Sequence, residues 1–253
     1  MSIRIIAKLD VKPPFLVKPV HFEGLRKIGT PKKYAQKYYE EGADEIFYID
    51  IVASLYQREI LHSQIQECAE NVYIPFAVGG GVRSIEDISK LIHLGADKVV
   101  INTYALQEKP SIIDEAVKIF GSQAITVNVE AKTVIKGKSW ECLSDCGRMR
   151  SDKDVLTWVD EVESRGAGEI LLQSVDMDGR QRGFDKELIS NVCNKVKIPV
   201  VAASGAGSLL DILEVAQECK PTGIALASLL HYNKFNITDV KNYLRENGVE
   251  VSR

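Results

Sequence analysis

The sequence lacks a long apolar run, a basic excess and a secretory leader. Its 32 Lys and Arg are balanced by 35 Asp and Glu, which gives a formal net charge of -3, so no basic surface for a nucleic-acid backbone is expected. The N-terminus enters a strand-like run at once, and no segment is long and apolar enough to cross a bilayer. We therefore expect a soluble, cytoplasmic protein that binds neither nucleic acid nor membranes.

Cysteine and histidine are few and scattered. The five cysteines are an odd number without regular spacing, which suits reduced thiols better than a disulfide framework. The closest pair, Cys142 and Cys146, has no second Cys or His pair nearby, and the four histidines lie far apart, so a zinc site is not expected. We predict that the chain uses no metal and no cofactor.

The chain does contain an internal repeat. The run Ile5–Lys12 has the same pattern as Ile125–Lys132. Each is a β-branched apolar strand that ends in one carboxylate, Asp10 or Glu130. Three later features recur in the same order: strands 43–48 and 168–172, strands 74–77 and 198–201, and glycine turns 79–81 and 205–207. A repeat of about 120 residues indicates duplicated half-barrels rather than a solenoid.

Strand-like and helix-like segments alternate along the chain. Thr30-Pro31 predicts a helix start before residues 32–41, a further helix is expected at 58–71, and Ser84-x-x-Asp87 and Ser208-x-x-Asp211 are capping boxes. Eight strand–helix units predict one (β/α)8 TIM barrel domain over residues 1–253, with reactive groups on the loops that follow the strands.

Two segments stand outside this alternation. Residues 11–29 are too long for a tight turn and contain Pro13-Pro14, so we interpret them as a functional loop. Residues 133–153 form a polar insertion that is the main departure from the repeat. It could be a lid or hairpin over the barrel mouth, or a plain surface excursion.

Two carboxylates, Asp10 and Glu130, would end strands one and five on opposite sides of the barrel mouth. Opposed carboxylates can act as general acid and base if one is protonated and the other is not; the simpler interpretation of Asp10 alone is a solvated strand end. Lysines surround the pair at positions 8, 12, 18 and 132. Asp50 and Asp176 also end strands and are candidates to support the site or bind hydroxyl groups.

Glycine turns precede two of the predicted helix N-termini. Glycine lets backbone N–H groups approach a phosphate, and the helix dipole adds attraction. One such turn could simply be a tight connection, but two at matching positions, followed by Asn102-Thr103 and Ala227-Ser228 on the next strands, predict a ligand with a phosphate at each end.

Four charged residues stand at strand starts, at the other end of the barrel. Arg4, Glu45, Lys98 and Glu169 begin strands one, two, four and six. Two cations and two anions could form a neutral ring, because a buried unpaired charge is costly. The ring could be a structural ion network that plugs the barrel floor, or a gate into the barrel core.

Together these motifs closely resemble the cyclase (HisF-type) subunit family of imidazole glycerol phosphate synthase, over essentially the full length. The stretches that carry the resemblance are Leu9–Lys12, Asp50–Ser54, Val78–Gly81, Lys98–Thr103, Phe120–Ala124, Arg165–Leu171 and Asp176–Gly179. The family consists of lyase/cyclase enzymes of histidine biosynthesis that act with a glutamine amidotransferase.

The resemblance implies a reaction and a partner. In the family, ammonia comes from a separate glutaminase (HisH-type) subunit, which forms a heterodimer at the N-terminal barrel face. The ammonia reacts with a bis-phosphorylated ribulosyl-formimino-aminoimidazole carboxamide, and cyclisation and cleavage yield imidazole glycerol phosphate and aminoimidazole carboxamide ribotide.

The resemblance also implies residue roles. Asp10 and Glu130 match the catalytic acid/base positions, and Lys18 matches the mobile-loop lysine. The phosphate-site positions are Gly81, Asn102, Thr103, Asp178, Gly179, Gly205, Ala227 and Ser228. Arg4, Glu45, Lys98 and Glu169 match the family's ammonia gate, which favours the gate over the floor plug.

The sequence departs from the usual family pattern at the ligand face. Pro13-Pro14-Phe15 replaces Asp-Gly-Arg, Glu130 replaces aspartate, and Val52, Val100, Gln173 and Met177 replace threonine, serine, threonine and arginine. Two alternatives therefore stay open. One is a paralogous subunit that accepts ammonia to form amidino groups on bacterial surface-polysaccharide sugars, with a nucleotide-type substrate; the other is a catalytically silent barrel that activates a glutaminase.

Overall fold

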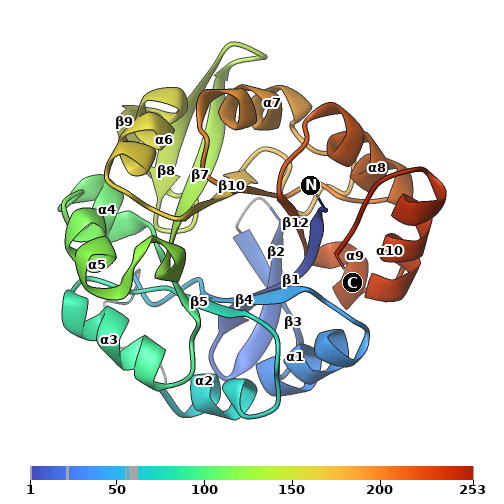
Figure 1. Cartoon of the computed structure of the whole chain (residues 1–253), viewed down its shortest axis with the longest axis horizontal. Coiled ribbons are helices and arrows are strands. Elements are labelled where there is room, and N and C mark those ends of the chain that lie inside the picture. Colours follow the sequence, from blue (N-terminus) through green and yellow to red (C-terminus); the bar gives the residue numbers. More distant parts are fainter. Residues whose placement is uncertain (1, 21–22, 55, 57–61, 253) are drawn as a thin grey trace.

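Eight parallel strands close into a barrel in the computed structural model, which describes residues 2–20, 23–54, 56 and 62–252 (Figure 1). The strands are β1 (Arg4–Lys12), β4 (Glu45–Asp50), β5 (Phe76–Gly79), β6 (Lys98–Ile101), β7 (Ile125–Ile135), β10 (Glu169–Ser174), β11 (Val200–Ala203) and β12 (Gly223–Leu226). Pairing of β12 with β1 and of β10 with β7 completes the circle. The predicted (β/α)8 barrel is confirmed.

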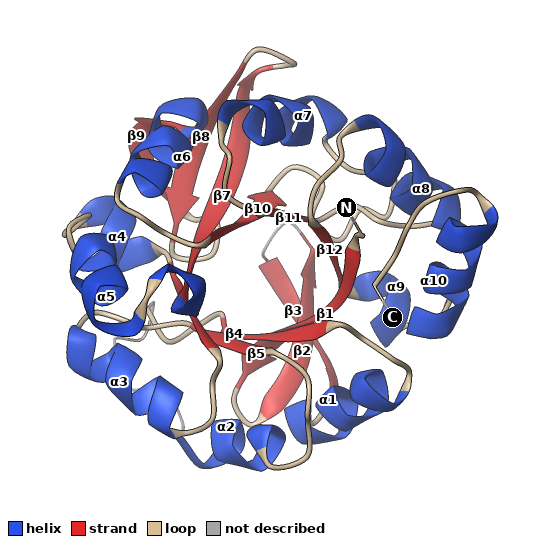
Figure 2. Ribbon diagram, in the orientation of Figure 1, coloured by secondary structure: helices blue, strands red, loops and turns tan. Residues whose placement is uncertain are grey.

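Helices surround the barrel on all sides (Figure 2). They are α1 (Pro31–Glu40), α2 (His62–Ala69), α3 (Ile85–His93), α4 (Thr103–Gln107), α5 (Ile112–Phe120), α6 (Val155–Ser164), α7 (Lys186–Lys195), α8 (Leu209–Glu218), α9 (Ser228–His231) and α10 (Ile237–Glu246), with a 3-10 turn at Ser122–Ala124. The helix predicted at residues 58–71 is α2, and residues 58–61 lie outside the described part of the chain. None of the helices described is long and apolar enough to cross a membrane.

The helix starts follow the predicted capping signals. Thr30 is the N-cap of α1 with proline in the first turn, although its side chain makes no capping bond. Ser84 and Ser208 both form complete capping boxes, with Asp87 and Asp211 respectively, and share the backbone angles φ -144° and ψ 165°. Matching caps at α3 and α8 show that the two half-barrels are repeated in local geometry as well as in sequence.

Side chains of the barrel strands alternate between two environments. On β1, Ile5, Ala7 and Leu9 pack outward against the helices, whereas Ile6 belongs to a separate apolar cluster inside the barrel. That inner cluster also contains Phe47, Leu171, Val201 and Ala225. It fills the middle of the barrel, so the polar interior side chains are confined to its two ends.

Two antiparallel hairpins correct the interpretation of residues 11–29 as a loop and confirm the hairpin among the interpretations of residues 133–153. Strands β2 (Phe15–Val20) and β3 (Glu23–Gly29) follow β1, and strands β8 (Ser139–Ser144) and β9 (Met149–Asp154) follow β7. The loop predicted at 11–29 is wrong because β1 runs on to Lys12 and turns at Pro13-Pro14, so that β2 can pair with it. The second segment is a hairpin, and it is no departure from the repeat, since each half carries one.

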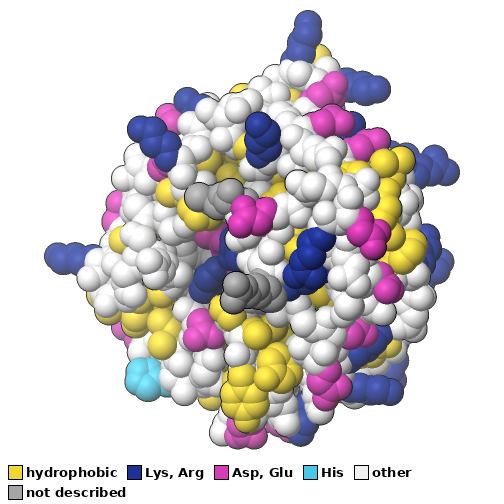
Figure 3. All heavy atoms as spheres, turned by 45° about the vertical axis from the view of Figure 1, so that its right-hand side comes forward, with side chains coloured by type: hydrophobic (Ala, Val, Ile, Leu, Met, Phe, Trp, Pro, Cys, Tyr) yellow, Lys and Arg dark blue, Asp and Glu magenta, His cyan; other side chains and the backbone are white. Residues whose placement is uncertain are grey.

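Charges of both signs are mixed over the face drawn in Figure 3. Lys and Arg side chains stand among Asp and Glu side chains there, with apolar patches between them. This face therefore offers no continuous basic stripe of the kind that a nucleic-acid backbone requires.

The repeated capping box gives a test of the fold. Ser208→Ala removes the hydroxyl that accepts a hydrogen bond from the Asp211 backbone N–H at 3.2 Å, and should lower the free energy of unfolding by about 1 kcal/mol. Urea unfolding measures the change. Ser89→Ala inside α3 is the control and should stay within about 0.5 kcal/mol of wild type; equal effects of both changes would contradict a capping role.

Candidate active site

Asp10 and Glu130 lie on opposite sides of the barrel mouth. Four steps along the circle of strands separate β1 from β7 in either direction, and both side chains are buried, with 1% and 3% of their surface exposed. The predicted opposition is therefore present in the structure. Neither residue is a solvated strand end.

Asp10 is held by two buried ammonium groups. Lys8 Nζ donates a hydrogen bond to its Oδ1, and Lys18 Nζ, on β2, lies 3.5 Å from its Oδ2 and 2.9 Å from Oδ1 of Asp178. Burial works to raise the pKa of Asp10, but the charges of Lys8 and Lys18 outweigh it and hold the pKa below its usual range. Asp10 is thus ionised at neutral pH.

Glu130 has a different environment. Asn128 Nδ2 donates to its Oε1 at 3.1 Å and the Gly147 backbone N–H donates to its Oε2 at 2.7 Å. Burial raises the pKa of Glu130 to about 7, because these two donors and the more distant Lys8 offset only part of the desolvation. Glu130 can therefore give or take a proton near neutral pH, whereas Asp10 stays charged.

The turn between β8 and β9 reaches into the mouth. Its residues Asp145, Cys146 and Gly147 have positive φ angles of 49°, 57° and 69°, a conformation that non-glycine residues adopt at a cost. The turn is held by the Asp145 N–H on Thr103 Oγ1 at 3.1 Å and by the Gly147 N–H on Glu130. The insertion at 133–153 thus supplies a hydrogen-bond donor to the second acid.

The predicted phosphate-binding residues gather in two pockets at the mouth. The first pocket is lined by Asp178, Gly179, Gly205, Ala227 and Ser228 together with Lys8, Lys18 and Gln173. The second is lined by Gly81, Asn102 and Thr103 together with Asp50, Glu130 and Asp145. Each predicted glycine turn therefore lies in one pocket with the residue pair predicted to accompany it, although phosphate binding itself stays a prediction.

The two pockets differ in charge. The first contains two ammonium groups and one carboxyl group, that of Asp178, whereas the second contains three carboxyl groups and no Lys or Arg among its described lining residues. Both have a glycine turn whose backbone geometry excludes a side chain: a Cβ at Gly80 would collide with the Asp50 carbonyl oxygen, and one at Gly205 with that of Gly183. The glycines are thus required by packing as well as by any ligand.

Asp50 and Asp176 have distinct positions. The Val52 backbone N–H donates to Asp50 Oδ1 at 3.1 Å, and Asp50 lines the second pocket. Asp176 lines neither pocket; it accepts hydrogen bonds from Lys132 Nζ at 2.5 Å and from the Thr133 N–H at 2.8 Å. Asp176 therefore ties the end of β10 to the extension of β7 and supports the mouth from outside.

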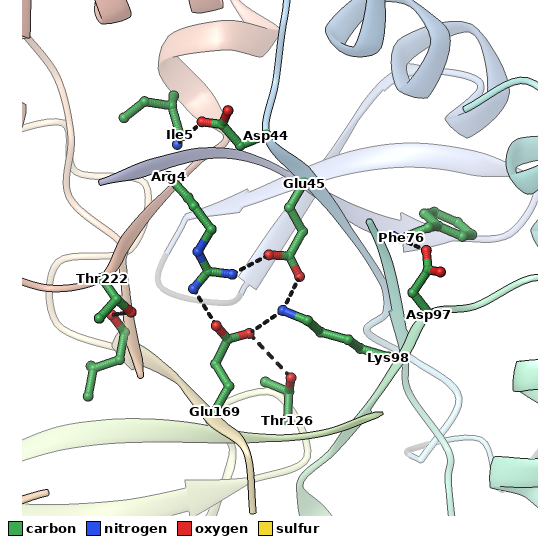
Figure 4. A network of polar contacts seen from close by, with 11 residues as sticks. Arg4, Ile5, Asp44, Glu45, Phe76, Asp97, Lys98, Thr126, Glu169 and Thr222 are labelled. Carbon is green, nitrogen blue, oxygen red and sulfur yellow. Dashed lines mark hydrogen bonds and ion pairs between the residues drawn. The ribbon is translucent and has the colours of Figure 1, made fainter. Parts of the chain in front are cut away.

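The four predicted charges form a closed ring at the opposite end of the barrel (Figure 4). Lys98 Nζ lies 2.8 Å from Glu45 and 2.9 Å from Glu169, and Arg4 pairs with Glu45 at 2.6 Å and also with Glu169. Thr126 Oγ1 adds a hydrogen bond to Glu169 at 3.4 Å. The ring is electrically neutral and spans the barrel floor.

Two residues of the mouth were not predicted from the sequence. Asn128 and Gln173 form a hydrogen-bonded row with Glu130 across the mouth, since Gln173 Nε2 donates to Asn128 Oδ1 at 2.8 Å. The period-2 alternation of a strand could have indicated Asn128, because it lies two residues before Glu130 and so on the same face. Gln173 stood out only as a departure from threonine.

Metal ligation finds no support in the described residues. None of their His, Cys, Asp and Glu side chains form a group of three or more that could hold a metal ion. The five cysteines are free thiols, and Cys146 donates its S–H to the Ile51 carbonyl oxygen at 2.9 Å.

Fold and site define a (β/α)8 barrel enzyme made of two duplicated halves, with an acid pair and two glycine-lined pockets at its mouth and a charged ring at its floor. A family profile described as "Histidine biosynthesis protein" matches residues 4–236. The chain belongs to the HisF family of histidine-biosynthesis proteins.

Three relatives, each named imidazole glycerol phosphate synthase subunit HisF, define the similarity. The Legionella pneumophila protein is 48% identical over 208 residues, covering 82% of this chain and 97% of that protein. The Helicobacter hepaticus protein is 44% identical over 248 residues, covering 98% and 97%. The Methanopyrus kandleri protein is 43% identical over 265 aligned residues, again covering 98% and 97%.

The raised pKa of Glu130 predicts a pH-dependent stability. Between 4.5, its ordinary value, and about 7, the folded protein keeps a proton that the unfolded chain has released, so stability falls as pH rises through this window. Glu130→Gln carries no such proton and should gain up to about 3 kcal/mol relative to wild type between about pH 5 and pH 8. Urea unfolding at several pH values measures this.

The matched control is Glu246→Gln, at an exposed position on α10. Its pH profile should run parallel to that of wild type. If the profile of Glu130→Gln ran parallel as well, Glu130 would have an ordinary pKa and the assignment of acid and base would be wrong.

Proposed function

We propose that this chain is the cyclase subunit of imidazole glycerol phosphate synthase. It uses ammonia to convert the phosphoribulosyl-formimino-aminoimidazole carboxamide ribotide into imidazole glycerol phosphate and aminoimidazole carboxamide ribotide. The observation that carries the proposal, given the family, is the pair of buried, opposed acids whose pKa values are shifted in opposite directions. Pairs of this kind divide general-base and general-acid work between two carboxyl groups.

The acid pair suits the addition of ammonia to a carbon atom. Nitrogen loses protons as it bonds to carbon, and the ionised Asp10 can accept one of them. A leaving group needs a proton, and Glu130, whose pKa is about 7, can supply it and be reprotonated at neutral pH. A substrate held between the two sides of the mouth would expose one reacting centre to both groups.

Ligand binding is assigned to the two pockets. In the first, the ammonium groups of Lys8 and Lys18, which also pair with Asp10 and Asp178, are available as donors, and the glycine turns around Gly179 and Gly205 leave backbone groups accessible to a phosphate. In the second, Thr103 and Gly81 contribute the corresponding backbone groups. Glu130 lines the second pocket, and the two lysines that contact Asp10 line the first, which suits a ligand phosphorylated at both ends.

Ammonia would enter from a glutaminase subunit bound at the N-terminal face. The floor ring is closed by four ion pairs, so passage requires at least one of them to part. Above the ring lies the apolar cluster with Ile6, Phe47 and Leu171. Such a layer admits neutral ammonia but opposes ammonium, because desolvating an unpaired charge is costly.

A second candidate acceptor is favoured by the charge of the second pocket. Glu130 and Asp145 line it without a lysine or arginine among the described lining residues, and carboxylates repel a phosphate dianion. An uncharged sugar would fit this end better. This supports the alternative of an ammonia-accepting subunit that forms amidino groups on bacterial surface-polysaccharide sugars; the buried acid pair argues against a silent barrel.

Turnover with ammonium salt tests the function. We expect wild type to consume the histidine intermediate without a glutaminase, and Asp10→Asn, which removes the proton acceptor at unchanged size, to lower kcat about a thousandfold. Asp160→Asn is the matched control: it makes the same chemical change on the solvent side of α6, where the side chain is 59% exposed, and should leave kcat unchanged.

The outcomes separate the candidates. Turnover of the histidine intermediate by wild type excludes the sugar acceptor as the main substrate. Ammonia-dependent conversion of a nucleotide sugar, without conversion of the histidine intermediate, would replace the first candidate by the second. Full activity of Asp10→Asn would refute the acid–base assignment in either case.

The gate is tested with the glutaminase present. Lys98→Met leaves Glu45 and Glu169 with Arg4 as their one remaining cation in the ring, and should cost about 3 kcal/mol of stability. If the ring is a gate, glutamine-dependent turnover changes relative to turnover with external ammonium, which reaches the mouth from solvent. Lys195→Met removes an exposed ion pair with Asp160 and serves as control. If the ratio of glutamine-dependent to ammonium-dependent turnover is unchanged in Lys98→Met, the ring is a structural plug of the barrel floor and not a gate.

A further inference from the structure

Three polar side chains form a row across the mouth of the barrel. Gln173 on β10 donates from Nε2 to Asn128 Oδ1 at 2.8 Å, and Asn128 on β7 donates from Nδ2 to Glu130 Oε1 at 3.1 Å. All three are buried, with 2%, 4% and 3% of their surface exposed. The strand register places Gln173 directly beside Glu130, so the row is built into the β7–β10 pairing.

The hydrogen bonds of the row run toward its carboxyl end. When Glu130 is ionised it can only accept, so Asn128 turns its NH2 group toward it and its oxygen toward Gln173. Gln173 must then present its own NH2 group to Asn128. Gln173 itself lines the first pocket, together with Lys8 and Lys18.

That oxygen is a buried acceptor without a hydrogen-bond partner among the described residues. Buried amide oxygens are rarely left so, because an unpaired buried polar atom destabilises the fold. Both neighbouring ammonium groups are engaged elsewhere: Lys8 with Asp10, and Lys18 with Asp10 and Asp178. The acceptor thus belongs to a residue that lines the pocket taken above as a phosphate site.

We propose that Gln173 is a ligand-binding residue of the first pocket, whose Oε1 accepts a hydrogen bond from a hydroxyl or N–H group of the ligand next to its phosphate. The proposal rests on the proposed function in taking this pocket as a phosphate site. It adds a requirement on the ligand: the atoms beside the phosphate must carry a donor. A polyol or sugar phosphate meets this requirement, and a phosphate on a bare alkyl chain does not.

Two small probes isolate the hydrogen bond. Glycerol 3-phosphate and n-propyl phosphate carry the same phosphate on three carbons and differ in the two hydroxyl groups. NMR titration of the full chain should show wild type binding glycerol 3-phosphate about tenfold more tightly, the effect of one hydrogen bond to an otherwise unpaired buried acceptor. Gln173→Met, of similar size and without an amide, should bind the two probes equally.

Ser174→Ala is the matched control. Ser174 is the next residue on β10, and its Oγ is likewise buried without a hydrogen-bond partner in the described part of the chain, but it does not line the first pocket. The variant should keep the tenfold preference. A loss of preference in both variants would mean that disturbing β10, rather than removing the Gln173 oxygen, is responsible, and would overturn the proposal.

Binding of the two probes to wild type alone also tests the role of Gln173, even if Gln173→Met fails to fold. Equal binding of the two probes overturns the role of Gln173 while leaving the pocket as a phosphate site. If neither probe binds, the pocket is not a phosphate site, and this part of the proposed function fails together with the inference. Preference for glycerol 3-phosphate that persists in Gln173→Met assigns the hydroxyl contact to another residue and refutes the proposal.

Discussion

Burying charge inside a closed barrel is the constraint on which the rest of this structure depends. The middle of the barrel is filled by apolar side chains such as Phe47 and Leu171, so every interior charge must find its partner at one of the two ends. At the floor, two cations and two anions pair in a neutral ring. At the mouth, Lys8 and Lys18 are balanced by Asp10 and Asp178.

Glu130 is the interior acid at the mouth that accepts its hydrogen bonds from an amide side chain and a backbone N–H rather than from a cation. Its pKa rises to about 7 for that reason, since neutral donors compensate less of the desolvation than an ammonium group does. The pKa values of the two acids therefore differ because Asp10 lies beside two ammonium groups, whereas Glu130 lies beside neutral donors. The proposed division of acid and base work follows from this difference, because the neighbours of Asp10 offset its desolvation fully and those of Glu130 offset it only in part.

The repeat made the fold predictable, because matching strands, glycine turns and capping boxes in two halves leave few architectures open. It also predicted that Asp10 and Glu130 end opposed strands, since equivalent positions in two half-barrels face each other across the mouth. The first hairpin was missed because its turns carry no Asn-Gly or Asp-Gly signal and Pro13-Pro14 argued for a loop, and the second was one of two interpretations left open for the same lack of a turn signal. Strand pairing across a turn is a tertiary preference that the local sequence did not reveal.

Within the site, positions fixed by the barrel were predictable and contacts between distant segments were not. The members of the floor ring start four different strands, and their convergence follows from the closure of the sheet. The Gly147 N–H reaches Glu130 only because the β8–β9 turn adopts three consecutive left-handed conformations. The same turn brings Asp145 into the second pocket, where it adds a third carboxyl group to those of Asp50 and Glu130.

The two halves thus share a backbone plan but differ in electrostatics. Each has a strand that ends in an acid, a hairpin after that strand and a glycine turn before a capped helix. In the first half the hairpin contributes Lys18 to its acid, whereas in the second it contributes a backbone N–H to Glu130. Duplication alone would give two equivalent acids, and equivalent acids cannot divide proton donation and acceptance between them. The hairpins supply part of that asymmetry, and the strands supply the rest, because Lys8 stands two residues before Asp10 on β1 where Asn128 stands two residues before Glu130 on β7.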